Sequence, residues 1–110
     1  MTEQTISEIP ASFERRQSNR KKIIVDVNFE GGQAIGMAST RDICQGGLYL
    51  MTTTRFDEGT LLSLRISLGG REISLAGTVI YTDSGHGIGV RFHDVSEENA
   101  KLLKHELELA

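Results

Sequence analysis

Apolar and polar side chains alternate along most of the chain after residue 22, a period of two that is typical of strands with one buried face. The clearest alternation covers residues 62–68, where Leu or Ile occupies every second position and Ser or Arg lies between them. The pattern predicts six strands, at approximately residues 23–29, 33–39, 48–53, 62–68, 73–81 and 88–92. Turns are expected at Gly31-Gly32, Gly46-Gly47, Gly69-Gly70 and residues 83–85.

Towards the C-terminus the period changes from two to about 3.6, as expected for an α-helix. Ser96 is a suitable N-cap, and the two glutamates after it lie where the helix dipole favours negative charge. The face expected to be buried consists of Ala100, Leu103, Leu107 and Ala110. We interpret the helix as a cover over one mouth of a barrel. A second interpretation is that Leu102 and Leu109, about a third of a turn away, also serve a partner surface.

The order of these elements predicts the fold class. Six strands joined by glycine-containing turns and followed by one helix are typical of a small antiparallel β-barrel with a C-terminal α-helix. A chain of 110 residues is expected to form one domain. Residues 1–12 are polar and predicted to be a flexible lead-in, and residues 13–110 form the domain, with the barrel at about 22–93 and the helix at about 96–109. Strands and helices do not alternate, so a doubly wound nucleotide-binding fold is not expected.

Composition narrows the possible environment of the chain. No stretch approaches the roughly 18 consecutive apolar residues that a membrane span needs, so we expect a soluble protein without membrane insertion. A single cysteine cannot form an internal disulfide. The first ten residues do not have the charged and then apolar character of a secretory leader, and we therefore expect a cytoplasmic protein.

The net charge of −3 is unevenly distributed. Residues 1–93 carry ten acidic and ten basic residues, whereas residues 94–110 carry five acidic residues and two lysines. Five of the 12 basic residues fall within residues 15–22. The isoelectric point of about 5.6 argues against a protein that coats DNA or RNA polymers. A local basic cluster is nevertheless sufficient to bind a small anion.

The first candidate binding segment is residues 15–20, RRQSNR, directly before the first predicted strand. An arginine side chain presents a planar fork that binds phosphate oxygens, or the O6 and N7 atoms of guanine, through two hydrogen bonds. Arg16 and Arg20 are spaced so that they could converge on one ligand in a turn or bracket a ligand in an extended segment. The alternative is a solvated basic patch without a specific ligand.

The second candidate segment is residues 42–47, DICQGG, between the second and third predicted strands. The carboxylate of Asp42 can accept hydrogen bonds from the N1–H and N2 amino groups of guanine. A short side chain at position 44 could complete this contact, and Gly47 permits a close approach that a Cβ atom would block. Taken alone, the same residues are also typical of an ordinary hairpin turn.

Together the two segments give the sequence its resemblance to the PilZ family of cyclic di-GMP receptors. That family carries an R-x-x-x-R segment before the barrel, matched here by Arg16 and Arg20, and a [D/N]-x-S-x-x-G segment after the second strand, matched by Asp42 and Gly47. The later sequences AGTV at 76–79 and GIGVRF at 87–92 are also similar to the family's. The resemblance extends from about Phe13 to the end of the chain.

The resemblance implies a six-stranded PilZ-type barrel with cyclic di-GMP bound on its surface. Arg16 and Arg20 would bind phosphate and the guanine Hoogsteen edge, and the segment from Asp42 to Gly47 would read a guanine. Arg15 would contact a second stacked ligand molecule, as an arginine at this position does in some relatives. Cys44 replaces the serine of the family pattern. A thiol is the weaker donor, so we expect the loss of about 1 kcal/mol, or roughly fivefold in affinity.

The leading functional hypothesis is a cyclic di-GMP receptor or adaptor that converts ligand binding into an altered interaction with an effector protein. The alternative is a PilZ-like adaptor that binds a protein but no longer binds cyclic di-GMP, in line with Cys44. A barrel that binds single-stranded nucleic acid would need stacking aromatic residues beside basic ones, and aromatic residues make up only 5 % of the chain. No cofactor, metal site or catalytic activity is expected, and the effector, the oligomeric state and the number of bound ligands stay open.

Overall fold

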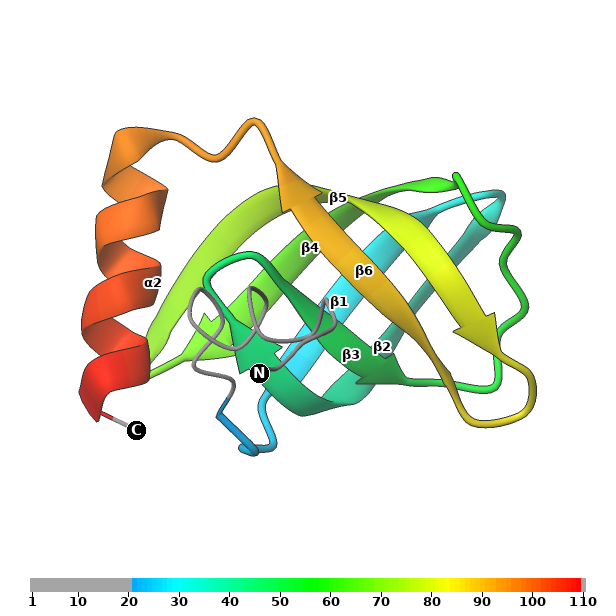
Figure 1. The fold of residues 1–110 in the computed structure, drawn as a ribbon, viewed down its shortest axis with the longest axis horizontal. Helices are drawn as coiled ribbons and strands as arrows, with labels where there is room; N and C mark the ends of the chain where they lie inside the picture. The colour runs from blue at the N-terminus through cyan, green and yellow to red at the C-terminus, as the bar shows by residue number, and fades with distance from the viewer. Residues whose placement is uncertain (1–20, 110) are drawn as a thin grey trace, which may run out of the picture.

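The computed structural model describes residues 21–109 of the chain. Within this range the elements are β1 (Asp26–Gly31), β2 (Ala34–Cys44), β3 (Gly47–Met51), β4 (Leu61–Leu68), β5 (Arg71–Asp83), β6 (Gly87–His93) and α2 (Glu97–Leu109). The strands form a closed barrel in the order β1-β2-β3-β6-β5-β4, and every neighbouring pair is antiparallel (Figure 1). The predicted six-stranded antiparallel barrel with a C-terminal helix is confirmed. The predicted lead-in at residues 1–12 lies outside the described residues.

The barrel interior is filled by the apolar side chains that the period-two pattern selected. In β4 the residues alternate strictly between exposed and buried, with Leu62, Leu64, Ile66 and Leu68 facing inward. β4 pairs with β1 on one side and with β5 on the other, so these side chains lie in the centre of the core. The buried apolar residues of all six strands form one cluster, which Phe56, Leu103 and Leu107 complete.

Of the four predicted turns, Gly69-Gly70 is confirmed, and the other three are shifted by one residue, to residues 32–33, 45–46 and 84–86. Gly69 and Gly70 connect β4 to β5 with φ angles of 60° and 78°, in the left-handed region that glycine adopts readily. The first turn is formed by Gly32 and Gln33, with φ angles of 56° and 68°, and not by Gly31-Gly32 as predicted. Gly31 pairs with Ala34 as the last residue of β1, which moves the turn by one residue.

The predicted bounds of the second strand were wrong because β2 exchanges partners along its length. Its first part pairs with β1 as far as Ser39, and its second part pairs with β3 from Ser39 to Cys44. The change of partner carries the strand five residues beyond the predicted end at residue 39. β5 is similarly long at 13 residues and pairs first with β4 and then with β6.

Residues 23–25 were predicted to begin the first strand, but they run beside β2 without belonging to a strand. The fully buried Thr40 holds them there. Its hydroxyl donates to the carbonyl of Ile23 at 2.8 Å and accepts from the amide of Val25 at 3.1 Å, while its own amide donates to the carbonyl of Val25 at 3.0 Å. Ile23 and Val25 pack partly against the core, so their predicted inward orientation is confirmed.

Two β-bulges interrupt the register of the long strands. In β2, Thr40 pairs with Leu50 and Asp42 pairs with Tyr49, which leaves Arg41 as the extra residue. In β5, the register shifts between Val79 and Tyr81. A bulge bends its strand and places two consecutive side chains on one face, where a regular strand would place them on opposite faces.

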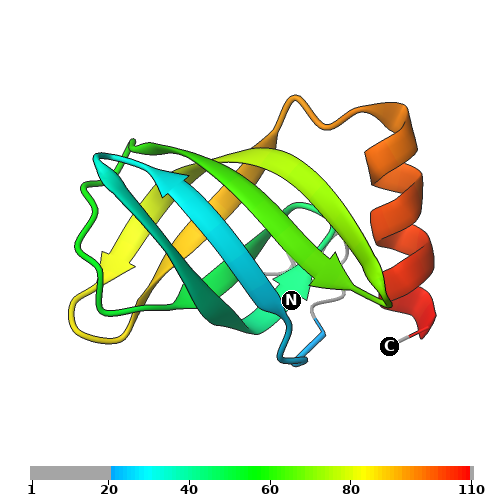
Figure 2. The ribbon, with the colours of Figure 1, turned by 180° about the vertical axis from the view of Figure 1, so that it is seen from behind.

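Helix α2 lies across one end of the barrel, as Figure 1 and the reverse view in Figure 2 both show. Ser96 caps it as predicted, since its Oγ accepts from the amide of Asn99 at 3.1 Å. Leu103 and Leu107 are buried, and Leu102 packs partly against the core. With 13 residues, many of them charged, α2 cannot span a membrane, and residues 21–109 contain no other helix that could.

The predicted buried face of α2 was wrong at one residue. Ala100 is exposed, and the half-buried Asn99 and the buried Glu106 complete the inner face instead. The side-chain amide of Asn99 donates to the carbonyl of Ser74 at 2.9 Å. The buried face of the helix therefore differs from the one that apolar periodicity alone predicts. Leu109 is exposed, and Ala110 lies outside the described residues.

The carboxylate of Glu106 lies against the turn between β4 and β5. Its Oε2 is 3.6 Å from the Nε of Arg71, and its Oε1 occupies the space that a Cβ on Gly69 would need. Gly69 therefore serves two purposes, because it adopts a left-handed backbone conformation and also makes room for the helix. The adjacent Gly70 has a similar backbone conformation, but a Cβ added there would meet no other atom within 4 Å.

We predict that Gly69→Ala lowers the free energy of unfolding by about 2–3 kcal/mol, while Gly70→Ala lowers it by only about 1 kcal/mol. Both substitutions strain the backbone, but only the first displaces Glu106 from its place. Urea denaturation of the two variants measures the difference. Equal losses would show that the contact between Glu106 and the turn contributes nothing to the docking of α2.

Candidate ligand-binding face

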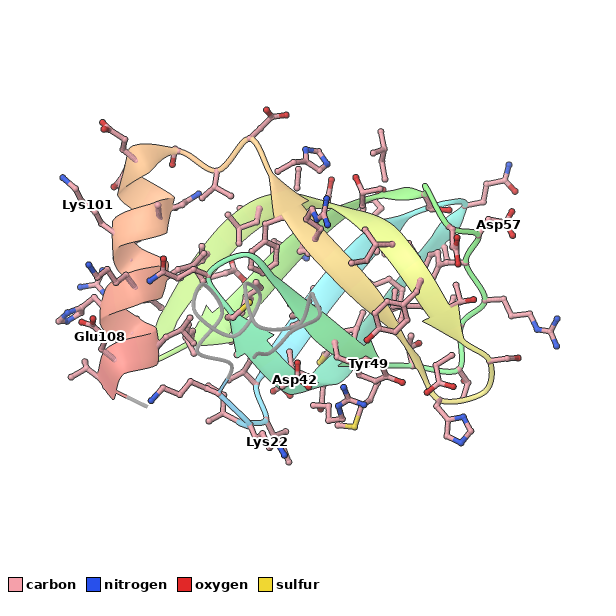
Figure 3. All side chains as sticks on the ribbon, viewed as in Figure 1. Lys22, Asp42, Tyr49, Asp57, Lys101 and Glu108 are labelled. Carbon is pink, nitrogen blue, oxygen red and sulfur yellow. The ribbon has the colours of Figure 1, made fainter. Side chains whose placement is uncertain are left out.

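The outer surface of the β2–β3 hairpin brings together three of the residues that the sequence singled out. Asp42 pairs with Tyr49 and Cys44 pairs with Gly47, while the intervening Ile43 points into the core. The alternation of strand side chains places Asp42 and Cys44 on the outside of the barrel. Both are nonetheless buried, with 5 % and 4 % of their surface exposed. Figure 3 shows Asp42 close to Tyr49, whereas Lys101 and Glu108 project from α2 away from the barrel.

The predicted arginine contacts, Arg15, Arg16 and Arg20, lie outside the described residues. The described chain begins at Lys21, whose amide donates to the carbonyl of Ile43 at 2.9 Å. The amide of Ile43 returns a hydrogen bond to the carbonyl of Lys21 at 3.0 Å. The residue that directly follows the arginine segment in the chain is therefore fixed to the residue between Asp42 and Cys44.

A polar network crosses this face from β2 to the end of β5. The Nε of Arg41 donates to Oδ2 of Asp42 at 2.9 Å, and the guanidinium lies 3.8 Å from the centre of the Tyr49 ring. The hydroxyl of Tyr49 donates to Oδ2 of Asp83 at 2.9 Å. Because the ring is held at its hydroxyl end, it forms a fixed support for the cation.

The electrostatics of the network keep Arg41 charged and Tyr49 neutral at neutral pH. The hydrogen bond to Asp42 raises the pKa of Arg41 above its usual value, although partial desolvation acts in the opposite direction. Burial raises the pKa of Tyr49, and the hydrogen bond to Asp83 adds to this effect. Arg41 is thus a permanent cation and Tyr49 a neutral phenol.

Glycines on β3 and β6 make room on this face for neighbouring groups. A Cβ on Gly47 would overlap the carbonyl oxygen of Val90 on the neighbouring strand, so the barrel itself requires glycine at this position. A Cβ on Gly89 would overlap the ring of Tyr81. The rings of Tyr49 and Tyr81 lie 6.2 Å apart between their centres at an angle of 42°. The sequence predicted that a ligand would approach the backbone closely at Gly47. In this structure the group that lies close to Gly47 belongs to β6.

Arg41, Tyr49, Tyr81 and Arg91 belong to this face but were not predicted as site residues. Arg91 is exposed and pairs with Gly47 across the β3–β6 ladder, which brings a second cation beside the predicted segment. The aromatic and basic character of these residues was visible in the sequence. Their convergence depends on strand register and on the bulge at Arg41, which short-range patterns do not specify.

The face offers hydrogen-bond acceptors, guanidinium groups and aromatic rings, a combination that suits a planar polar ligand. Among residues 21–109, no group of three or more His, Cys, Asp and Glu side chains is arranged to hold a metal ion. His86 and Asp83 lie together in the β5–β6 turn, where Nδ1 of His86 is 3.0 Å from the carbonyl of Ser84. This histidine therefore contacts a backbone carbonyl of its own turn.

Comparisons with known proteins agree with this fold. The PilZ domain family model matches residues 14–109. The PilZ domain of CeSA from a cellulose-synthesizing bacterium has 21 % identity and a TM-score of 0.65, and the match covers 82 % of this chain and 96 % of that one. The inhibitor of motility MotI/DgrA of Bacillus subtilis has 20 % identity and a TM-score of 0.72, and the match covers 86 % of this chain and 50 % of that one.

At these identities the two solved structures establish the shared fold. A comparison with curated proteins gives no significant match. The family model spans nearly the whole chain, and the barrel order and the terminal helix agree with it. The chain therefore belongs to the PilZ domain family, whose members are binding and adaptor domains.

Proposed function

We propose that this PilZ domain is a cytoplasmic cyclic di-GMP receptor that, on binding its ligand, changes the surface offered to an effector protein. The observation that carries the proposal is the backbone pairing of Lys21 with Ile43. It ties the residue that directly follows the arginine segment to Ile43, which lies within the Asp42–Gly47 segment. Lys21 and the second motif are more than 20 residues apart in the sequence, and this pairing supports the proposal that the two motifs act on one ligand.

The chemistry of the ligand suits the residue types of the two segments. Cyclic di-GMP carries two phosphate charges and two guanines. Arg16 and Arg20 would bind phosphate and the Hoogsteen edge of guanine through their planar forks. Asp42 would accept from the N1–H and N2 amino groups of a guanine, donors that a carboxylate pairs well with. Arg15 would contact a second ligand molecule if two stack on the face.

The alternative function is an adaptor that binds its protein partner without responding to cyclic di-GMP. Cys44 favours this alternative, because it replaces a serine of the family pattern and is 4 % exposed. A buried thiol offers a ligand a weaker hydrogen bond than a hydroxyl does. The two functions differ in one measurable property, namely whether the set of captured partner proteins changes when cyclic di-GMP is added.

We predict that the wild-type chain binds cyclic di-GMP in a calorimetric titration, and that Arg16→Ala and Arg20→Ala each weaken binding by about tenfold or more. Asp42→Ala should weaken binding similarly, because it removes the acceptor for guanine. Arg55→Ala is a matched control, since Arg55 is exposed in the loop between β3 and β4. Failure of the wild type to bind at about 50 μM would refute the receptor function.

A second prediction concerns the thiol itself. Cys44→Ser should tighten binding of cyclic di-GMP by about fivefold, because a hydroxyl regains roughly 1 kcal/mol of hydrogen bonding. Cys44→Ala is the control, since it removes the thiol without adding a donor, and it should bind no tighter than the wild type. Equal affinities of the serine and alanine variants would mean that position 44 makes no polar contact with the ligand.

A further inference from the structure

Arg41 and Asp42 are consecutive residues, yet their side chains meet on the same outer face of the barrel. The bulge in β2 causes this, because Arg41 is the extra residue between the paired positions Thr40 and Asp42. The resulting contact joins Nε of Arg41 to Oδ2 of Asp42 at 2.9 Å. The Asp42 side chain is 8 % exposed, whereas that of Arg41 is 56 % exposed.

Arg41 is also held from a second strand. Its guanidinium lies 3.8 Å from the centre of the Tyr49 ring on β3, and Tyr49 is itself anchored through its hydroxyl to Asp83 on β5. The ring and the carboxylate therefore constrain the guanidinium from two directions. A cation held in this way fixes the orientation of the carboxylate to which it donates.

We propose that Arg41 is a positioning residue for base recognition, which holds the Asp42 carboxylate in the orientation that accepts the N2 amino group of guanine. The proposal rests on the proposed function of the chain as a cyclic di-GMP receptor. A carboxylate offers about four acceptor positions, so the bond from Arg41 is compatible with further bonds from a base. An acceptor whose orientation is already fixed loses less conformational freedom when the ligand binds.

If the contact between Arg41 and Asp42 is only a structural ion pair, the loss of Arg41 should have different effects on stability and on affinity. A largely exposed arginine paired with a carboxylate contributes little to stability, so its loss should barely affect folding. A structural role would also alter the affinity for all similar ligands equally. If Arg41 positions Asp42, its loss should instead change the ratio of affinities for two ligands that differ only in the group that Asp42 contacts.

The test compares cyclic di-GMP with its inosine analogue, which retains N1–H, O6 and N7 but lacks the N2 amino group. Calorimetric titrations of both ligands are made with the wild type and with Arg41→Gln and Arg65→Gln. Arg65 is a matched control because it is an exposed arginine on the outer face of β4, which is not part of the candidate face. Melting temperatures of all three proteins are measured in parallel.

We expect the wild type to prefer cyclic di-GMP over the inosine analogue by about tenfold, and Arg41→Gln to reduce this preference to about twofold. Arg65→Gln should keep the wild-type preference, and the melting temperatures should agree within about 2 °C. Arg41→Lys retains the charge but not the planar fork, so its preference should lie between those of the wild type and Arg41→Gln.

The outcomes separate the two proposals. If the wild type binds but Arg41→Gln keeps the full preference, Arg41 has no positioning role and the receptor function stands. If Arg65→Gln loses the preference to the same extent, the effect is one of general charge and the positioning role is refuted. If the wild type binds neither ligand, both the receptor function and the role of Arg41 are refuted.

Discussion

The closure of six strands into one barrel is the constraint on which the rest of the structure depends. Pairing of β1 with β4 closes the ring, and a ring of so few strands requires strong bending. β2 and β5 accommodate it, since each is long enough to exchange one partner for another along its length. Each also carries a bulge in the part that pairs with its second partner, and bulges are the local means by which a strand bends.

The candidate face is a consequence of this bending. Without the bulge in β2, Arg41 and Asp42 would point to opposite sides of the sheet, and one of the two charged side chains would face the apolar core. With it, both lie outside, next to Tyr49. Across the same row, Tyr49 pairs with Gly89, and Gly89 pairs with Tyr81, which follows the bulge in β5. The two bends thus border one continuous row of residues across β3 and β6.

The sequence alone was sufficient to predict those elements whose structure is determined by local interactions. The alternation at residues 62–68 identified β4 because each position has an unambiguous inner or outer preference. Asp42, Cys44 and Gly47 could be singled out from the sequence because they form one short motif. Arg41 and Tyr49 were missed because the bulge lies where β2 exchanges β1 for β3, and that position depends on three strands. Glu106 was missed because its burial depends on space left by Gly69, 37 residues earlier. The roles of Arg15, Arg16 and Arg20 stay predictions, since these residues lie outside residues 21–109.

A site on the outside of a closed barrel restricts how ligand binding could act on a partner protein. The core has no part in the face, so binding there need not disturb the packing that stabilises the barrel. The chain that leads from the arginine segment is fixed to β2 by the backbone of Ile43 and by the buried hydroxyl of Thr40. Asp42 lies between these two attachment points on the same strand. For the proposed ligand, the arginine contacts and the guanine contact would therefore share one rigid support. A change in the surface on ligand binding would then arise from the segment before Lys21 and from the network around Arg41, while the barrel stays unchanged.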